Sequence, residues 1–158
     1  MTPNLTPRIA LYRGTGAVGW LIKKQSRSVY SHAALLAPGS DNQVLESREF
    51  KGVQFNKLTD NDKLSIDWFA IPSMTDQEYQ IAFDFAQKQI GMPYDYWSVA
   101  RFLTKVPARE NGKWFCSELV FKSIAEAGLR LLKRIESAEV APGLLSYSPL
   151  LMQVSPPD

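Results

Sequence analysis

Residues 38–42, with the sequence PGSDN, separate two apolar stretches and constrain the fold more strongly than any other part of the chain. The stretches on either side, residues 32–37 and 43–48, have the composition of strands, so the three segments together predict a β-hairpin. A turn centred near Ser40 places residue 32 opposite residue 48 in an antiparallel pair. This register decides which side chains share a face of the sheet.

The rest of the chain predicts a mixture of strands and helices, and hence an α+β fold. Short apolar runs and period-two alternation predict further strands over residues 9–13, 50–58 and 63–71. In the last of these, Leu64, Ile66 and Trp68 are expected on one face. Capping signals and apolar residues at helical spacing predict helices over residues 17–24, 75–90, 96–103 and 117–127, with a helical turn at 142–146. A polar loop is expected over 107–112, and an extended tail ends the chain.

The 158 residues contain a single cysteine and a single histidine, and 45% of them are hydrophobic. This length and hydrophobic content predict one domain over residues 1–158 with a single core. A lone cysteine excludes an intramolecular disulfide, and one Cys with one His cannot complete the four-ligand thiolate and imidazole set of a structural zinc site. The fold is therefore expected to depend on packing alone, and no cofactor is expected.

Charge and hydropathy exclude several classes of partner. The 18 basic and 16 acidic residues give a net charge of +2 and are scattered along the chain, so nucleic acid is not an expected partner. The N-terminus has no basic leader followed by an apolar run, and no stretch reaches transmembrane length. We therefore expect no integral membrane segment and a cytoplasmic location, although a wall-directed enzyme can be released by a route that needs no signal of its own.

The single cysteine and the single histidine lie in patterns that suit nucleophilic chemistry. Cys116 opens the predicted helix over residues 117–127, where unpaired backbone N–H groups and the helix dipole favour a thiolate. His32 lies at the start of a predicted strand and is the candidate base for that thiol. Taken alone, a free cysteine is more often a buried hydrophobe, and a strand histidine is more often structural. Their joint placement favours a catalytic pair.

An acid is needed to hold the imidazole in one tautomer, and the hairpin register favours Glu46. Because His32 faces residue 48, Glu46 is its diagonal neighbour on the same face, roughly 7–8 Å away at the backbone. Glu49 has the opposite parity, although a bulge or a one-residue slip would reverse the choice. Glu118 is interpreted as structural, because it lies in the first turn of the predicted helix and complements its dipole.

Three aromatic residues are candidates for substrate binding: Tyr30, Tyr94 and Trp114. A phenol near the nucleophile can donate to an oxyanion or to substrate, and an indole can form a wall of the cleft. Packing in the core is the alternative interpretation of these aromatic residues. Three basic residues between positions 105 and 113 favour a thiolate at Cys116 or an acidic substrate, although a solvated loop explains them equally well.

Four short segments, taken in their order, resemble the permuted NlpC-type, YiiX-like cysteine hydrolases. They are YSH at residues 30–32, VLE at 44–46, GMPYD at 91–95 and FCSELV at 115–120. The histidine precedes the cysteine, as in the permuted branch, whereas the unpermuted relatives have the cysteine helix first. The resemblance implies a papain-like α+β core in which the helix that carries the nucleophile packs on an antiparallel sheet. It also implies Cys116 as nucleophile, His32 as base and Glu46 as the residue that orients the ring.

The expected activity is that of a thiol hydrolase that cleaves an amide or an ester through an acyl-enzyme on Cys116. The substrate class stays open among small molecules, peptides, isopeptides and lipid esters. Two alternatives remain, which are a noncatalytic module that binds a peptide or a lipid head group in the same cleft, and a thiol acyltransferase. The acyltransferase ranks lower, because residues 116–118 lack the Asn-Cys-Glu-His pattern of the lecithin:retinol acyltransferase-like proteins.

Overall fold

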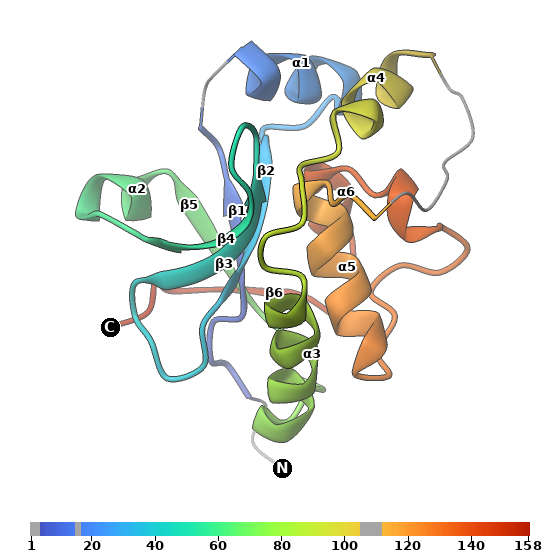
Figure 1. The fold of residues 1–158 in the computed structure, drawn as a ribbon. Coiled ribbons are helices and arrows are strands. Elements are labelled where there is room, and N and C mark those ends of the chain that lie inside the picture. The colour runs from blue at the N-terminus through green and yellow to red at the C-terminus, as the bar shows by residue number, and fades with distance from the viewer. Residues whose placement is uncertain (1–3, 15–16, 105–111) are drawn as a thin grey trace.

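The predicted hairpin is present, and it forms part of a six-stranded sheet in which each neighbouring pair of strands is antiparallel. The computed structural model describes residues 4–14, 17–104 and 112–158. The strands are β1 (Ile9–Tyr12), β2 (His32–Leu36), β3 (Gln43–Arg48), β4 (Gly52–Lys57), β5 (Ile66–Ala70) and β6 (Met152–Val154). Their order across the sheet is β4-β3-β2-β1-β5-β6, and Figure 1 shows the sheet to the left of the two longest helices.

The hairpin has the register that its sequence predicts. Leu35 of β2 faces Leu45 of β3. Extended along the strands, this pairing sets residue 32 opposite residue 48, as expected for a turn centred near position 40. On its other side β2 pairs with β1, which sets Tyr12 beside His32. The two ladders together fix the face of the sheet to which His32 belongs.

Alternation along the strands divides their side chains between two faces of the sheet. The larger core lies on one face, against α3 (Asp76–Lys88) and α5 (Cys116–Glu126). Its members from the strands are Ile9, Leu11, Ala33, Leu35, Leu45, Val53 and Phe69. The second cluster has the opposite parity and consists of Ala10, Tyr12, Ala34, Leu36, Val44, Leu58, Ile66 and Trp68. His32 and Glu46 share the parity of this second set.

The remaining helices are shorter than α3 and α5. They are α1 (Ala17–Ser26), α2 (Asp60–Leu64), α4 (Tyr96–Thr104), the 3₁₀-helix η1 (Ser137–Glu139) and α6 (Pro142–Leu145). The N-cap of α4 is the predicted one, since Asp95 Oδ1 accepts the N–H of Trp97 at 3.0 Å. Helix α1 contacts α4 and α6, and Figure 1 shows α1 and α4 at the upper end of the molecule, beyond the start of α5.

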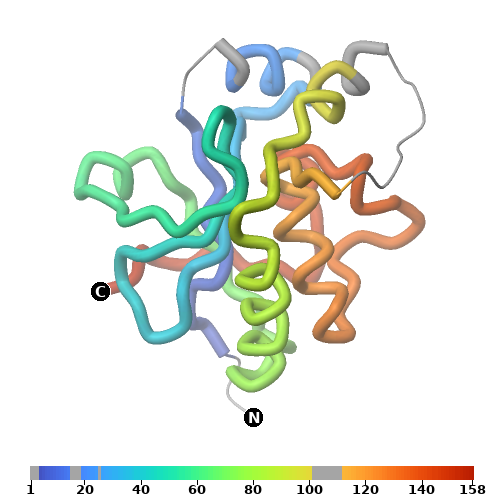
Figure 2. Tube along the Cα trace, in the orientation of Figure 1, coloured from blue at the N-terminus to red at the C-terminus, as the bar shows by residue number. Residues whose placement is uncertain are grey.

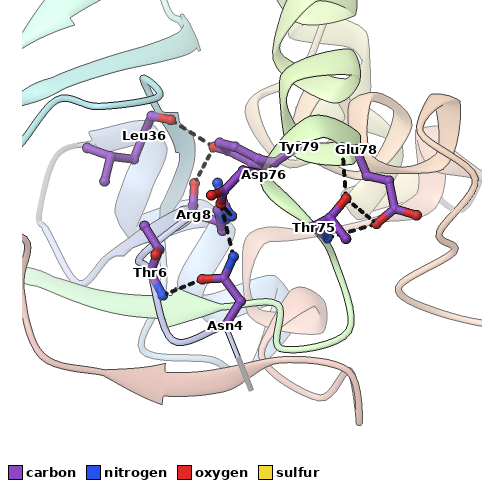
Figure 3. A network of polar contacts seen from close by, with 8 residues as sticks. All are labelled: Asn4, Thr6, Arg8, Leu36, Thr75, Asp76, Glu78 and Tyr79. Carbon is purple, nitrogen blue, oxygen red and sulfur yellow. Dashed lines mark hydrogen bonds and ion pairs between the residues drawn. The ribbon is translucent and has the colours of Figure 1, made fainter. Parts of the chain in front are cut away.

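Helix α3 begins with the predicted capping box, and polar contacts tie it to the N-terminal segment (Figure 3). Thr75 Oγ1 accepts the N–H of Glu78 at 3.2 Å, and Glu78 Oε2 accepts the N–H of Thr75 at 2.8 Å. Asp76 accepts a hydrogen bond from the guanidinium of the buried Arg8. The hydroxyl of Tyr79 donates to the carbonyl of Arg8 at 2.7 Å. These bonds hold α3 against the segment that leads into β1.

The strand predicted over residues 63–71 is wrong at its start. Thr59 caps α2 there, in a box like that of α3 with Asp62 in place of the glutamate, and β5 begins only at Ile66. Leu64, expected on a face shared with Trp68, is 78% exposed. The alternation of apolar and polar residues continues across the end of the helix, so alternation alone does not mark the boundary.

Other differences from the sequence prediction are smaller. The strand predicted over residues 50–58 is shorter, because Phe50 has a positive φ of 64° and lies in the turn before β4. The helix predicted to reach residue 90 ends at Lys88. The expected extended tail contains β6, which pairs with β5. The loop predicted over 107–112 lies outside the described residues, except for Gly112.

Candidate active site

The hairpin brings His32 and Glu46 into contact. His32 Nε2 lies 2.6 Å from Glu46 Oε2. The side chain of Glu46 is fully buried, and that of His32 is 15% exposed. This contact follows from the register, because the two residues are diagonal neighbours of one parity. One face of the hairpin therefore presents an imidazole together with a carboxylate partner.

Arg48 and Tyr12 complete the surroundings of this pair. Arg48 Nε lies 3.0 Å from Glu46 Oε1, in an ion pair that lacks hydrogen-bond geometry. The ring of Tyr12 stands edge-on to His32, with the centroids 4.9 Å apart. Burial opposes the ionisation of Glu46, but the hydrogen bond and charge of His32 and the charge of Arg48 outweigh it and hold the pKa of Glu46 below its usual value. Glu46 is therefore a carboxylate at neutral pH.

Cys116 is also a neighbour of His32. Burial lowers the pKa of His32, but the charge of the Cys116 thiolate, its hydrogen bond with the ring and the hydrogen bond to Glu46 together raise that pKa to about 9. Because Nε2 is engaged by Glu46, Nδ1 is the ring nitrogen left for the sulfur. His32 therefore interacts with the thiol of Cys116 and with the carboxylate of Glu46.

The start of α5 fixes the backbone of Cys116. The preceding residue, Phe115, is extended, and its N–H donates to Glu118 Oε2 at 3.4 Å. This bond gives Glu118 the structural role expected for it. Ser117 donates its hydroxyl to the carbonyl of Val140, which ties the helix start to the segment before α6. Hydrogen bonds of the residues before and after Cys116 thus fix the backbone at the candidate nucleophile.

The segment before α5 runs beside the stretch that follows α3, as the chain trace in Figure 2 shows. Tyr94 and Trp114 form a parallel bridge between the two. Ser47 of β3 donates its hydroxyl to the carbonyl of Trp114 at 2.6 Å. On the other side, the N–H of Val53 in β4 donates to the carbonyl of Met92 at 2.9 Å. Two strands of the sheet therefore position the residues that lead into α5.

Gly52 is required where β4 meets this stretch. Its φ is +72°, and a Cβ at this position would lie 2.3 Å from the carbonyl oxygen of Met92. Glycine avoids both the strained backbone and the steric clash. The close approach of β4 to the stretch after α3 therefore depends on this one residue.

Tyr94, one of the three aromatic residues predicted to bind substrate, is a neighbour of Cys116. Its ring packs edge-on to Phe115, with the centroids 5.8 Å apart. Burial raises the pKa of the Tyr94 phenol, and the charges of the Cys116 thiolate and of Glu49 raise it further. The phenol therefore keeps its proton and remains a hydrogen-bond donor close to the thiol.

The other two predicted substrate-binding side chains face elsewhere. The hydroxyl of Tyr30 donates to Asp67 Oδ2 on β5 at 2.7 Å. The indole N–H of Trp114 donates to Gln89 Oε1 on α3 at 3.1 Å. Trp114 lines a hollow of about 340 Å³ together with Phe85, Gln89, Gly112, Lys113, Glu118, Lys122 and Ser137. The structure thus brings Tyr94 to Cys116, while the side chains of Tyr30 and Trp114 make other contacts.

An apolar cluster covers Cys116. Ile22 of α1 and Val99 of α4 pack in one cluster with Phe115 and Cys116, and Leu21 of α1 packs against it. Cys116 is only 1% exposed in this arrangement. These residues therefore contribute to shielding Cys116 from solvent.

Tyr12, Arg48 and Ser47 lie around the site but are not among the residues predicted from the sequence. The position of Arg48 could have been predicted, because the predicted register sets it opposite His32 and on the same face as Glu46. The position of Tyr12 could not, since its pairing with His32 joins strands separated by a helix. Ser47 acts through a carbonyl of a segment distant in sequence.

Comparison with known proteins identifies a family and a similar fold. A sequence model of the permuted papain-like amidase enzymes of the YaeF/YiiX type, the C92 family, matches residues 15–139. The crystal structure of the metalloprotein YiiX from Escherichia coli O157:H7 is similar, with a TM-score of 0.70 and 17% identity, over 99% of this chain and 98% of that chain. At this identity the likeness shows the fold alone, which is the expected permuted papain-like α+β arrangement. No curated protein matches the sequence.

The described part of the chain does not fit a metal centre of its own. Across residues 4–14, 17–104 and 112–158, no three His, Cys, Asp or Glu side chains are grouped so that they could hold a metal ion. The donors that do meet, a thiol, an imidazole and a carboxylate, suit nucleophilic and acid–base chemistry. Within the same residues, no helix combines the length and the apolar character needed to cross a membrane.

Proposed function

Because the chain belongs to the permuted papain-like amidase family of YaeF and YiiX, we propose that it hydrolyses amide bonds with Cys116 as nucleophile, His32 as acid and base, and Glu46 as the residue that orients the ring. The observation that carries this proposal is the position of His32, which binds Glu46 through Nε2 and interacts with Cys116. The chain has one cysteine and one histidine, and they meet although they stand at positions 32 and 116.

The proposed reaction starts from a thiolate–imidazolium pair, in which the raised pKa of His32 favours the protonated ring. The sulfur attacks the carbonyl carbon, so that a C–S bond forms and the carbonyl electron pair moves to the oxygen. As the C–N bond breaks, His32 donates its proton to the leaving nitrogen and an amine departs. The neutral ring then takes a proton from water, whose oxygen displaces the sulfur and releases a carboxylic acid.

Glu46 has two tasks in this scheme. Its carboxylate accepts from Nε2 and so keeps the proton on that nitrogen, which directs Nδ1 to the sulfur. Its charge also stabilises the imidazolium that must persist until the amine leaves. The ion pair with Arg48 holds the other carboxylate oxygen and so limits the rotation of Glu46.

The proposed oxyanion contacts come from the N–H of Cys116 and the phenol of Tyr94. Cys116 is the first residue of α5, and the first N–H groups of a helix have no acceptor within it. Tyr94 supplies a proton donor that burial keeps neutral. Since loss of one oxyanion donor typically costs about 10²–10³ in rate, Tyr94→Phe is expected to lower kcat by that order.

The first test is alkylation of the single cysteine with iodoacetamide as a function of pH. A thiolate held by an imidazolium is expected to react well below pH 8, and His32→Ala is expected to remove this advantage. Circular dichroism of the two proteins controls for the fold. If the wild type and His32→Ala both react as ordinary thiols, the proposal fails and a noncatalytic binding module is favoured.

The second test follows the reaction itself. The protein is incubated with panels of peptide, isopeptide and lipid amides and esters, and intact-mass spectrometry looks for a transient acyl adduct. The adduct and the released acid are expected for the wild type, and both are expected to be absent for Cys116→Ser. Addition of an amine or alcohol acceptor separates hydrolysis from acyl transfer, because a transferase converts the acceptor to a conjugate in place of the free acid.

A further inference from the structure

Several strongly exposed aromatic side chains gather at one end of the molecule. Trp20 of α1 is 59% exposed, Trp97 of α4 is 68% exposed, and Phe50 in the turn between β3 and β4 is 89% exposed. Tyr96 links α4 to that turn, since its ring lies 6.0 Å from that of Phe50 and its hydroxyl accepts the Phe50 N–H at 2.7 Å. Because α1 contacts α4 and both lie at the same end of the molecule, these four residues lie on neighbouring elements, and we call them the aromatic surface.

The exposure of two tryptophans is the unusual part of this surface. The other two tryptophans of the chain, Trp68 and Trp114, are buried and half-buried. Single exposed apolar residues are common in folded proteins, but a contiguous group on neighbouring elements marks a surface that meets a partner. The residues of the aromatic surface lie on neighbouring elements, because they come from α1, from α4 and from a turn of the sheet that Tyr96 joins to α4.

The charged side chains on and beside the elements of the aromatic surface are mostly positive. Helices α1 and α4 contain no acidic residue. Lys24 lies with Nζ 4.9 Å from the centroid of the Trp20 ring, and Arg27 and Lys51 are exposed nearby in sequence. Glu49, the acid of the turn, has one carboxylate oxygen buried. The surface therefore combines aromatic rings with cations.

We propose that the aromatic surface docks on an anionic lipid bilayer. Tryptophan and tyrosine favour the headgroup region of a bilayer, and amphipathic helices with cations on their polar side lie in the plane of that interface. An anionic bilayer also complements the cations near Trp20, because its lipid headgroups attract positive side chains. A protein partner would need acidic side chains at matching positions. Docking would place the bilayer over the helices whose inner residues, Ile22 and Val99, cover Cys116.

The test is binding of the full chain to vesicles of phosphatidylcholine with and without phosphatidylglycerol, measured by flotation. The wild type is expected to bind the anionic vesicles, and Trp20→Ser with Trp97→Ser is expected to bind them at least about tenfold more weakly. The matched control is Leu64→Ser with Ile81→Ser, which removes exposed apolar side chains from α2 and α3. The control is expected to bind like the wild type.

Two further variants separate the contributions. Lys24→Glu with Arg27→Glu is expected to weaken binding to anionic vesicles and to make the remaining binding insensitive to salt. Cys116→Ser is expected to bind as the wild type does, so that failure of lipid binding and failure of the proposed hydrolysis are separate outcomes. Absence of vesicle binding by a folded wild type, or an equal loss in the control, overturns the proposal. So does a wild-type dimer that the tryptophan variant converts to a monomer without any vesicle binding, since the surface is then an interface between two copies.

Discussion

Replacement of Glu46 by glutamine removes the negative charge behind His32 while changing little else. The glutamine has the same size, and its amide oxygen can still accept from Nε2, which lies 2.6 Å from the carboxylate. Arg48 loses its ion-pair partner, but its side chain is 40% exposed and can be hydrated. The variant is therefore expected to fold and to report on charge.

The size of the effect follows from the pKa of His32. Its rise from 6.5 to about 9 corresponds to about 3 kcal/mol. Burial works against this rise, and Cys116 contributes more to it than Glu46 does. We therefore expect Glu46→Gln to lower the pKa of His32 by about one unit, or about 1.4 kcal/mol. The imidazolium then loses its proton at a lower pH than in the wild type.

The assay is an NMR titration of the imidazole Cε1–H. The chain has one histidine, so the signal belongs to His32 without further assignment. The matched control is Glu49→Gln, because Glu49 has the opposite parity on the hairpin and is not among the groups that set the pKa of His32. Cys116→Ser is expected to lower the pKa further than Glu46→Gln does, because the thiolate is the larger contributor.

Two results would refute this reasoning. One is a folded Glu46→Gln variant in which His32 titrates at the wild-type pKa. The other is a larger shift in Glu49→Gln than in Glu46→Gln, which would mean that the hairpin register selects the wrong acid. In the proposed mechanism, the alkaline limb of kcat/KM moves with the pKa of His32, because the amine leaves only while the ring is protonated.

Further substitutions test how backbone geometry and an unpaired buried hydroxyl each affect the stability of the protein. Gly52→Ala is expected to destabilise the protein by about 3 kcal/mol or more, because its φ is positive and the new Cβ meets the carbonyl oxygen of Met92 at 2.3 Å. Gly39→Ala has the same φ of +72° but open space around it, so urea unfolding should show a cost of only about 1–2 kcal/mol; equal costs would contradict the steric explanation. Tyr12→Phe is expected to be neutral or to stabilise by about 1 kcal/mol, because among the described residues the buried hydroxyl has no hydrogen-bond partner, and a clear fall in melting temperature would count against this account.

The features that can be predicted from the sequence depend on contacts close together in the chain. The PGSDN turn sets the register of β2 and β3, and the register alone makes Glu46 the diagonal neighbour of His32. The box of Thr75 and Glu78 likewise marks the start of α3, because both partners lie within one helical turn. In each case a few neighbouring residues determine the geometry.

The features that cannot be predicted depend on segments that meet only in the folded chain. Tyr12 stands edge-on to His32 because β1 pairs with β2 across a connection that carries α1. Strand β6 has three residues and is a strand only because β5 offers it an edge. The indole of Trp114 donates to Gln89 on α3, a contact between segments far apart in the sequence. None of these contacts leaves a periodic signal in the local sequence.

The order of the site residues along the chain has a consequence for synthesis on the ribosome. His32 and Glu46 emerge early, in a hairpin formed by local contacts, whereas Cys116 emerges 70 residues after Glu46. Helix α5 packs against α3, β2 and β3, so its full docking surface exists only when those elements are in place. Until α5 docks, Cys116 therefore lacks its contact with His32. In the proposed mechanism, the nucleophile is assembled only when the chain has folded. The growing polypeptide is therefore not exposed to cleavage by its own active site.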